Sequence, residues 1–170
     1  EANFPPERLD IEITESCLHE NVTVVRTLIS SLRNQGIRVS LDDFGTGYSS
    51  LAQLRSLPFD HIKIDRSFVS NLMESPDSET IVKAITSLGE GLGMPVTAEG
   101  VETRDVLERL KGYGRYKAQG YYYGRPQPAD QTSEFLAERN MLAQPVAQPD
   151  LTPKADEPPA GEDGPAKRSA

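Results

Sequence analysis

The sequence predicts an α/β fold in which short parallel strands alternate with amphipathic helices. Five short segments alternate apolar and polar residues or are rich in β-branched and aromatic residues, as strands are. Between them, apolar residues recur every three or four positions, which is the period of a helix with one buried face. Parallel βαβ units of this kind fit either an open doubly wound sheet or part of a TIM-type (βα) barrel. Periodicity does not choose between the two.

The expected elements follow one another in chain order. The expected strands are residues 9–13, 37–41, 61–64, 95–98 and 119–123. The expected helices are residues 22–32, 81–92, 106–110 and, with a weaker pattern, 132–142. Gly36 stands where a C-terminal helix cap is expected, and Asp77 and Ser78 precede the second helix where its N-terminal cap is expected.

The composition changes near Pro145. Residues 145–170 hold six of the 13 prolines and no aromatic residue. Such a segment buries too little apolar surface to offset its loss of conformational entropy, so we expect it to be disordered. The sequence therefore predicts one α/β domain at 1–144, followed by a Pro-rich disordered tail at 145–170.

Composition also argues against several classes of protein. The net charge is −8, with 26 acidic and 18 basic residues, and the sequence has no run of Lys or Arg. We therefore expect that the protein does not bind DNA or RNA through the phosphate backbone. The single Cys17 rules out an intrachain disulfide and argues against a cysteine-based zinc site. No signal peptide is present, nor any run near the ~20 apolar residues that span a bilayer. We expect a cytoplasmic location. Because the chain begins at Glu1, we also expect it to be part of a longer parent protein. Any membrane attachment of that parent would then come from its upstream segments.

Polar side chains stand at the ends of the expected strands. They are Glu12 and Glu15, Asp42 and Asp43, Lys63 and Asp65, Glu99 and Glu102, and Gln119. In a βα barrel these ends meet at one mouth, where active sites lie. Carboxylates gathered there repel one another unless a cation binds between them, and all-oxygen sites suit Mg²⁺ or Mn²⁺. Two adjacent aspartates indicate two metal ions, a type of site that typically hydrolyses phosphate esters.

Each of these residues also has a simpler interpretation. Taken singly, Glu12, Lys63 and Gln119 read as solvent-facing groups, and the aspartate pair reads as a turn or a helix cap. Their recurrence at five successive strand ends favours an active site. The Gly-Thr-Gly segment at 45–47 allows close backbone approach and suits a loop around metals or a neighbour, although a tight surface turn is its simpler explanation.

Five motifs together resemble the EAL domain. They are EITES at 12–16, DDFGTGYSSL at 42–51, IKID at 62–65, AEGVET at 98–103 and AQGY at 118–121. They occur in the order and at the spacing of that family, and the resemblance covers residues 4–137. It is specific, because five independent motifs have to agree.

The resemblance implies a modified βα barrel that hydrolyses cyclic di-GMP to linear pGpG. By this resemblance, Glu12 and Asp42 ligate one Mg²⁺ or Mn²⁺ ion, and Asp43 ligates a second. Lys63 looks like the lysine that holds the attacking water or a phosphate oxygen. Glu99 looks like the carboxylate that serves as general base or metal-site ligand.

The resemblance assigns two further roles. Gln119 looks like the amide that completes the shell around the metals. Glu15 resembles the residue that anchors a loop used at the family's homodimer interface. That loop is residues 44–50 and contains Phe44, Gly45, Thr46 and Gly47.

The departures from the family pattern are also informative. The Glu-Ala-Leu signature and a metal-binding Asn are absent and belong upstream of Glu1, so the resemblance implies the last five of eight βα units, with a regulatory or cyclase domain further upstream in the parent. The chain alone is then expected to be inactive. Arg115 and Tyr116 replace the usual Cys-Asp, with little catalytic effect expected.

Two other functions stay open at this point. One is a catalytically silent receptor that binds cyclic di-GMP, although receptors of that kind usually lose the metal ligands retained here. The other is an unrelated metal-dependent barrel enzyme, which requires the agreement of the motifs to be accidental.

Overall fold

A computed structural model describes residues 4–19, 21–47 and 51–142 of the 170-residue chain. The chain divides into two compact units, Glu1–Pro126 and Gln127–Ala170. Within the second unit, helix α6 spans Ala129–Glu138. The expected tail at 145–170, and with it the expected domain limit at 144, lies outside the described residues.

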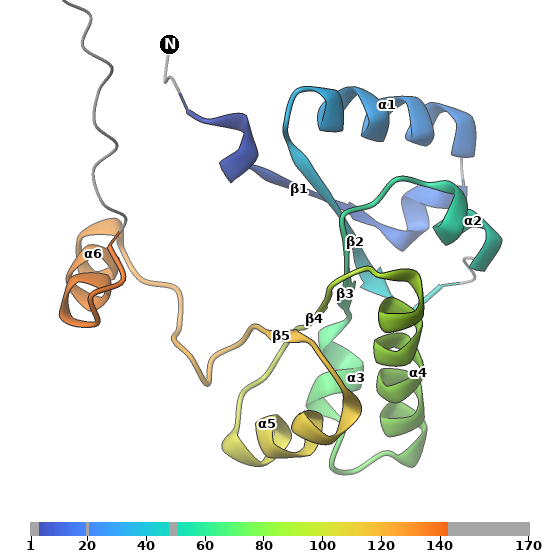
Figure 1. Ribbon diagram of the computed structural model, residues 1–170. Helices are drawn as coiled ribbons and strands as arrows, with labels where there is room; N and C mark the ends of the chain where they lie inside the picture. Colours follow the sequence, from blue (N-terminus) through green and yellow to red (C-terminus); the bar gives the residue numbers. More distant parts are fainter. Residues whose placement is uncertain (1–3, 20, 48–50, 143–170) are drawn as a thin grey trace, which may run out of the picture. The chain divides into compact units, whose positions relative to one another are not determined.

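The first unit is built around one sheet of five parallel strands (Figure 1). The strands are β1 Asp10–Thr14, β2 Arg38–Phe44, β3 His61–Ile64, β4 Val96–Ala98 and β5 Lys117–Ala118. Their order in the sheet is their order in the chain. In a doubly wound sheet the order in which strands are added reverses part-way along the chain, whereas in a barrel each strand lies beside the preceding one. The fold is therefore consistent with part of an α/β barrel.

Helices connect the strands (Figure 1). They are α1 Val22–Asn34, α2 Leu51–Ser56, α3 Arg66–Ser70, α4 Pro76–Leu92 and α5 Arg104–Leu110, with 3₁₀ turns η1 Pro6–Arg8, η2 Glu15–His19 and η3 Lys111–Tyr113. Helices α1, α4 and α5 confirm the three stronger helical patterns. In the described residues, no helix is long and apolar enough to cross a membrane.

Local side-chain chemistry sets where the long helices begin and end. The Asn21 side chain accepts hydrogen bonds from the first turn of α1, and Gly36 follows that helix at φ +85°, in the left-handed region that suits glycine. Asp77 and Ser78, which were expected as the N-terminal cap, lie inside helix α4, which begins at Pro76. The Ser75 hydroxyl caps its first turn, and Pro76 fits the first helical position because a backbone N–H is not needed there.

The observed elements differ from the expected ones in three further places. The last strand lies at Lys117–Ala118 and not at 119–123, because the chain turns after Gly120: the Tyr123 N–H donates to the Gly120 carbonyl. The short helices α2 and α3 had no predicted counterpart. Helix α6 begins three residues before the expected position and ends four residues earlier.

The central strands are buried on both faces. One set of side chains packs with the helices in the core: Val39, Leu41, Ile62, Ile64, Val96 and Ala98. Between them along the strands stand Ser40, Lys63 and Thr97, which are also buried. Because consecutive side chains of a strand point to opposite faces, the polar set lines the face away from the helices. That face carries the candidate site.

An ion cluster ties α5 and η3 to α4. Glu79 Oε1 lies 2.7 Å from Lys83 Nζ and 2.9 Å from Arg109 Nη2, and it accepts a hydrogen bond of 2.9 Å from the Tyr113 hydroxyl. The Lys83 ammonium also lies 4.9 Å from the centre of the Tyr113 ring. Hydrogen bonds from Lys83, Arg109 and Tyr113 lower the pKa of Glu79 from 4.5 to about 2.

This cluster predicts a pH dependence of stability. Since the pKa of Glu79 is lower in the folded state, its carboxylate stabilises the fold above pH 4.5, and that contribution is lost as the pH falls through about 2. Glu79→Gln is therefore expected to lower Tm at neutral pH, and its Tm difference from the wild type should shrink in acid. Thermal denaturation across pH measures this. The control is Glu74→Gln, a carboxylate with no ion pair in the described part of the chain. A difference that is constant with pH contradicts the prediction.

Candidate active site

The ionisable residues expected at a barrel mouth do lie at the carboxyl ends of neighbouring strands. Glu12 is on β1, Asp42 and Asp43 are on β2, and Lys63 is on β3. Glu99 directly follows β4. Parallel pairing aligns these ends, with Thr14 of β1 opposite Asp42. Residues that are up to 87 positions apart in the sequence, from 12 to 99, thus lie together at the carboxyl ends of the strands.

Lys63 is the centre of this group. Its ammonium Nζ lies 2.5 Å from Glu12 Oε1, 2.7 Å from Glu99 Oε1 and 3.4 Å from Asp42 Oδ1. Only 4% of Lys63 is exposed. Burial lowers the pKa of this ammonium, but its hydrogen bonds to Glu12 and Glu99 outweigh burial and raise the pKa above its ordinary value. Lys63 is therefore a fixed positive charge among three carboxylates.

A bulge in β2 sets both aspartates opposite Lys63 in the pairing of the two strands. Leu41 pairs with Ile62 and Phe44 with Ile64, so two residues of β2, Asp42 and Asp43, stand opposite the single Lys63 of β3. Asp43 has φ +54°, a left-handed conformation that is uncommon outside glycine. The bulge turns two adjacent carboxylates to one edge, where regular pairing would send them to opposite faces.

The two aspartates differ in their surroundings. Burial raises the pKa of Asp43, and the neighbouring charge of Asp42 raises it further. Oδ1 of Asp42 is buried and accepts no hydrogen bond from any described residue, although Lys63 Nζ lies 3.4 Å away. A buried carboxylate oxygen without a donor is costly, and a bound cation would satisfy it.

Asp65, which was expected at the end of the third strand but received no specific role, is a neighbour of this group. Its carboxylate caps α3 through the backbone N–H of Ser67 at 2.9 Å and also accepts from the Ser67 hydroxyl. Burial raises its pKa, but these hydrogen bonds and one from Asp43 outweigh burial and lower it. The signal was present in the sequence, because Asp65 follows Lys63 by two positions at the same strand end.

The donor set suits a hard divalent cation, since Glu12, Asp42, Asp43 and Glu99 offer only carboxylate oxygens. Within residues 4–19, 21–47 and 51–142, however, no three His, Cys, Asp or Glu side chains converge closely enough to hold a metal ion. The Lys63 ammonium lies among three of the carboxylates instead. The unsatisfied Asp42 oxygen fits a metal ligand, and the set as a whole needs further ligands.

Glu15 holds the loop that follows β2. It is 2% exposed, and its Oε2 accepts hydrogen bonds from the backbone N–H groups of Gly45 at 3.0 Å and Gly47 at 3.1 Å. A Cβ at Gly47 would lie 2.9 Å from the Glu15 carboxyl carbon, so only glycine allows this approach. The Thr46 hydroxyl donates to the Asp43 carbonyl, which closes the turn, and Phe44 is buried beside it. Residues 48–50 of the expected loop lie outside the described residues.

Removing this anchor should loosen the loop. Glu15→Ala deletes two charge-assisted hydrogen bonds, and the free energy of unfolding is expected to fall by about 1–3 kcal/mol. The amide hydrogens of Gly45 and Gly47 should exchange with solvent faster, which NMR measures residue by residue. Glu15→Gln keeps an acceptor oxygen and is the matched control, expected to lie between the wild type and Glu15→Ala. Unchanged exchange in Glu15→Ala would refute the anchoring role.

Gln119 lies beside Glu99 through the backbone. It directly follows β5, and its N–H donates to the Ala98 carbonyl at 2.9 Å. Its exposed side chain makes no hydrogen bond to another described side chain. A cavity of about 180 Å³ opens here, lined by Arg66, Glu99, Gly100, Glu102, Gln119, Gly120 and Tyr121. The sequence-predicted residues from β4 and β5 therefore share one pocket.

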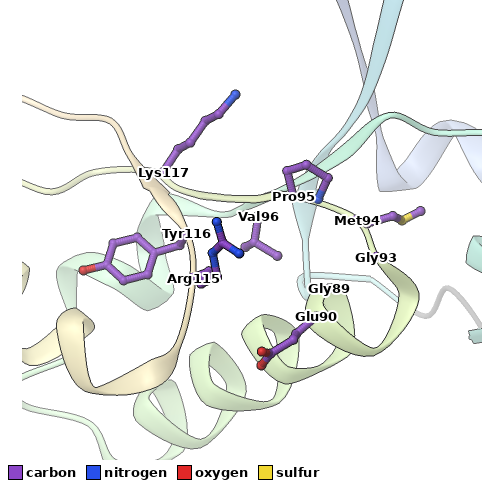
Figure 2. A pocket seen from close by; sticks show the side chains of 9 residues that line it. All are labelled: Gly89, Glu90, Gly93, Met94, Pro95, Val96, Arg115, Tyr116 and Lys117. Carbon is purple, nitrogen blue, oxygen red and sulfur yellow. The ribbon is translucent and has the colours of Figure 1, made fainter.

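A second pocket lies at the opposite ends of the same strands (Figure 2). It has a volume of about 380 Å³ and is lined by Gly89, Glu90, Gly93, Met94, Pro95, Val96, Arg115, Tyr116 and Lys117. Arg115 and Tyr116, which replace the Cys-Asp of the resembled family, thus stand where β5 begins, away from the carboxylates. Their effect on the chemistry stays a prediction.

Comparison with known proteins decides the family. A family model of the EAL domain matches residues 1–126, which include all five motifs. The chain belongs to the EAL domain family. It is 42% identical over 129 residues to the cyclic di-GMP phosphodiesterase PdeR of Escherichia coli, a match that covers 76% of this chain and 20% of PdeR. It is also 42% identical over 135 residues to the bifunctional diguanylate cyclase/cyclic di-GMP phosphodiesterase MucR of Pseudomonas aeruginosa, covering 79% of this chain and 20% of MucR.

Solved structures of EAL proteins share the fold. The MucR phosphodiesterase in complex with cyclic di-GMP superposes with a TM-score of 0.73 at 41% identity, over 76% of this chain and 52% of that chain. BlrP1 of Klebsiella pneumoniae, in complex with manganese and cyclic di-GMP, has a TM-score of 0.67 at 34% identity, over 72% of this chain and 31% of that chain. The chain spans between 16% and 20% of the length of the curated relatives that it matches.

Proposed function

We propose that the protein carrying this chain is a metal-dependent phosphodiesterase that hydrolyses cyclic di-GMP to linear pGpG. The observation that carries the proposal is the buried Lys63 ammonium held by Glu12, Asp42 and Glu99, from four neighbouring strands of an EAL domain. A cyclic dinucleotide presents two anionic phosphodiesters. A fixed cation beside carboxylates that are able to bind metal ions suits the hydrolysis of such a group.

The residues divide the work in this proposal. Glu12 and Asp42 would hold one Mg²⁺ or Mn²⁺ ion, and Asp43 would hold a second; when bound, these ions supply Lewis-acid activation of water and neutralise phosphate charge. Lys63 donates hydrogen bonds to the attacking water or to a phosphate oxygen. In this proposal Glu99, whose carboxylate lies 2.7 Å from Lys63, accepts the proton of that water.

The remaining parts of the proposal concern the surroundings of the site. The side-chain amide of Gln119, at the end of β5, completes the shell of groups around the metal ions. We propose that three further strands, supplied from outside this sequence, complete an eight-stranded barrel and add metal ligands, because the described carboxylates do not come together closely enough to hold a metal ion. The loop anchored by Glu15 is proposed to lie at a homodimer interface.

The experiment separates turnover from binding. The purified full-length protein is incubated with Mg²⁺ or Mn²⁺ and either cyclic di-GMP or a generic phosphodiester such as bis(p-nitrophenyl) phosphate, and the products are resolved by chromatography. We expect pGpG from the dinucleotide and little cleavage of the generic ester. Tight binding of cyclic di-GMP by calorimetry, without pGpG in either metal, would instead identify a receptor. Equal cleavage of both substrates would show that the site does not select the cyclic dinucleotide and would contradict the proposed specificity.

A further inference from the structure

The loops that follow β3, β4 and β5 approach one another through two glycines. A Cβ built on Gly120 would lie 2.3 Å from the carbonyl oxygen and 2.4 Å from the nitrogen of Val101. A Cβ built on Gly100 would lie 2.8 Å from the Cβ and 3.3 Å from the Cα of Arg66. All four atoms belong to the backbone or are attached directly to it, so no side chain can swing away to make room.

Backbone hydrogen bonds continue the pairing of β4 and β5 past the ends of both strands. The Gln119 N–H donates to Ala98 at 2.9 Å, the Val101 N–H donates to Gln119 at 3.0 Å, and the Tyr122 N–H donates to Val101 at 3.0 Å. Strand β5 itself has only two residues. The alignment of Gln119 with Glu99 therefore depends on contacts made after the strand has ended, and Gly120 lies in the middle of them.

The same glycines lie next to the reactive groups. Gly100 follows Glu99, which contacts Lys63 at 2.7 Å, and Gly120 follows Gln119. Any side chain at 120 has to push the two loops apart by several tenths of an ångström, because real Cβ atoms do not approach other atoms within 3.0 Å. Displacements approaching 1 Å at a reacting group cost up to about 10²-fold in rate.

We propose that Gly100 and Gly120 are positioning residues that set the spacing of Lys63, Glu99 and Gln119 across three adjacent strand ends. This inference rests on the proposed function, because the spacing matters for the hydrolysis that these groups carry out. Gly120 acts through Gln119, and Gly100 acts through Glu99.

The chain offers a matched control for each glycine. Gly124 has open space around its Cβ position, as Gly120 does not. Gly93 has φ +66°, close to the +73° of Gly100, and likewise has open space. Gly93→Ala therefore introduces the same backbone strain as Gly100→Ala without the steric overlap. Gly124→Ala tests the loss of a loop glycine alone.

The test is a double-mutant cycle on the full-length protein with cyclic di-GMP and Mn²⁺. Gly120→Ala is expected to lower kcat about 10-fold or more with a smaller change in KM, and Gly124→Ala about twofold or less. In a Gln119→Ala background, Gly120→Ala should lower kcat by a much smaller factor, because the side chain that Gly120 positions is no longer present. An equal loss in both backgrounds would mean that Gly120 serves only folding, and it would overturn the proposal.

Two further outcomes are decisive. If Gly120→Ala does not fold, the cycle of Gly100→Ala with Glu99→Gln replaces it, with Gly93→Ala as control; unfolding of both glycine variants would assign these residues to the fold and overturn the proposal. A wild-type protein that forms no pGpG would contradict the proposed function and not the positioning role. The same cycle is then read from the affinity for cyclic di-GMP, where additive losses would overturn the inference.

Discussion

Replacing Lys63 by methionine in the full-length protein is expected to lower turnover of cyclic di-GMP by about 10²-fold or more. Methionine keeps the aliphatic stem that fills the buried position and removes only the ammonium, so a cavity does not account for the loss. Mutations that remove one charge-stabilising donor from an active site typically cost about 10²–10³-fold in kcat. The positive charge lost here faces Glu12, Asp42 and Glu99 at once.

The Lys63 substitution has an internal comparison. Lys111→Met removes an exposed lysine that pairs with Glu108 at 2.7 Å and should leave turnover within about twofold, as surface ion pairs contribute little. Lys63→Ala should be as inactive as Lys63→Met and less stable, because it also leaves a cavity. Steady-state kinetics and thermal denaturation of the three variants measure both effects. Turnover near the wild-type level in Lys63→Met would remove Lys63 from the chemistry.

The 170-residue chain by itself is expected to form no pGpG and to be marginally stable. In the described part of the chain, β1 pairs only with β2 and β5 only with β4, so both edges of the sheet expose unpaired backbone groups. A closed barrel has no such edges. Exposed apolar side chains, among them Leu9, Val24 and Leu28, add to the tendency to aggregate. The carboxylates also do not converge on a metal ion without further ligands.

Complementation tests this expectation. The chain is assayed with Mn²⁺ and cyclic di-GMP alone, and again after addition of the N-terminal part of the EAL domain of the full-length protein as a separate polypeptide. Activity is expected only in the second case, together with a sharper unfolding transition. Cooperative unfolding and pGpG formation by the chain alone would show that its own residues suffice for the metal site.

Much of the fold was predictable because the strands are buried and the helices are amphipathic. Segments 37–41 and 61–64 have apolar residues at every second position, and the structure places β2 and β3 there. The position of the last strand was predicted wrongly, because three consecutive tyrosines have high strand propensity. In the structure, tertiary contacts of Gly120 end the strand before these tyrosines. Helices α2 and α3 are only six and five residues long, too short for a periodic pattern.

The sequence indicated which residues lie near one another in the candidate site, but it did not indicate their geometry. Strand-end positions indicated Glu12, Asp42, Lys63 and Glu99, but the central place of Lys63 follows from the register of β2 and β3. The bulge that puts two aspartates opposite one lysine leaves no signal in the residue types. Asp65 was expected at a strand end without a role, because its capping of α3 is visible only when that short helix is known.

The central claim is that the residues at the carboxyl ends of β1 to β4 form a metal-dependent phosphodiesterase site. One measurement tests this claim most directly. The full-length protein is freed of metal with a chelator and given cyclic di-GMP, Mn²⁺ is then titrated in, and pGpG is quantified by chromatography at each step. We predict no pGpG without metal and a saturable rise with Mn²⁺, which Asp42→Asn shifts to higher concentration or abolishes. Formation of pGpG that is independent of metal, or its absence at every Mn²⁺ concentration, would contradict this account.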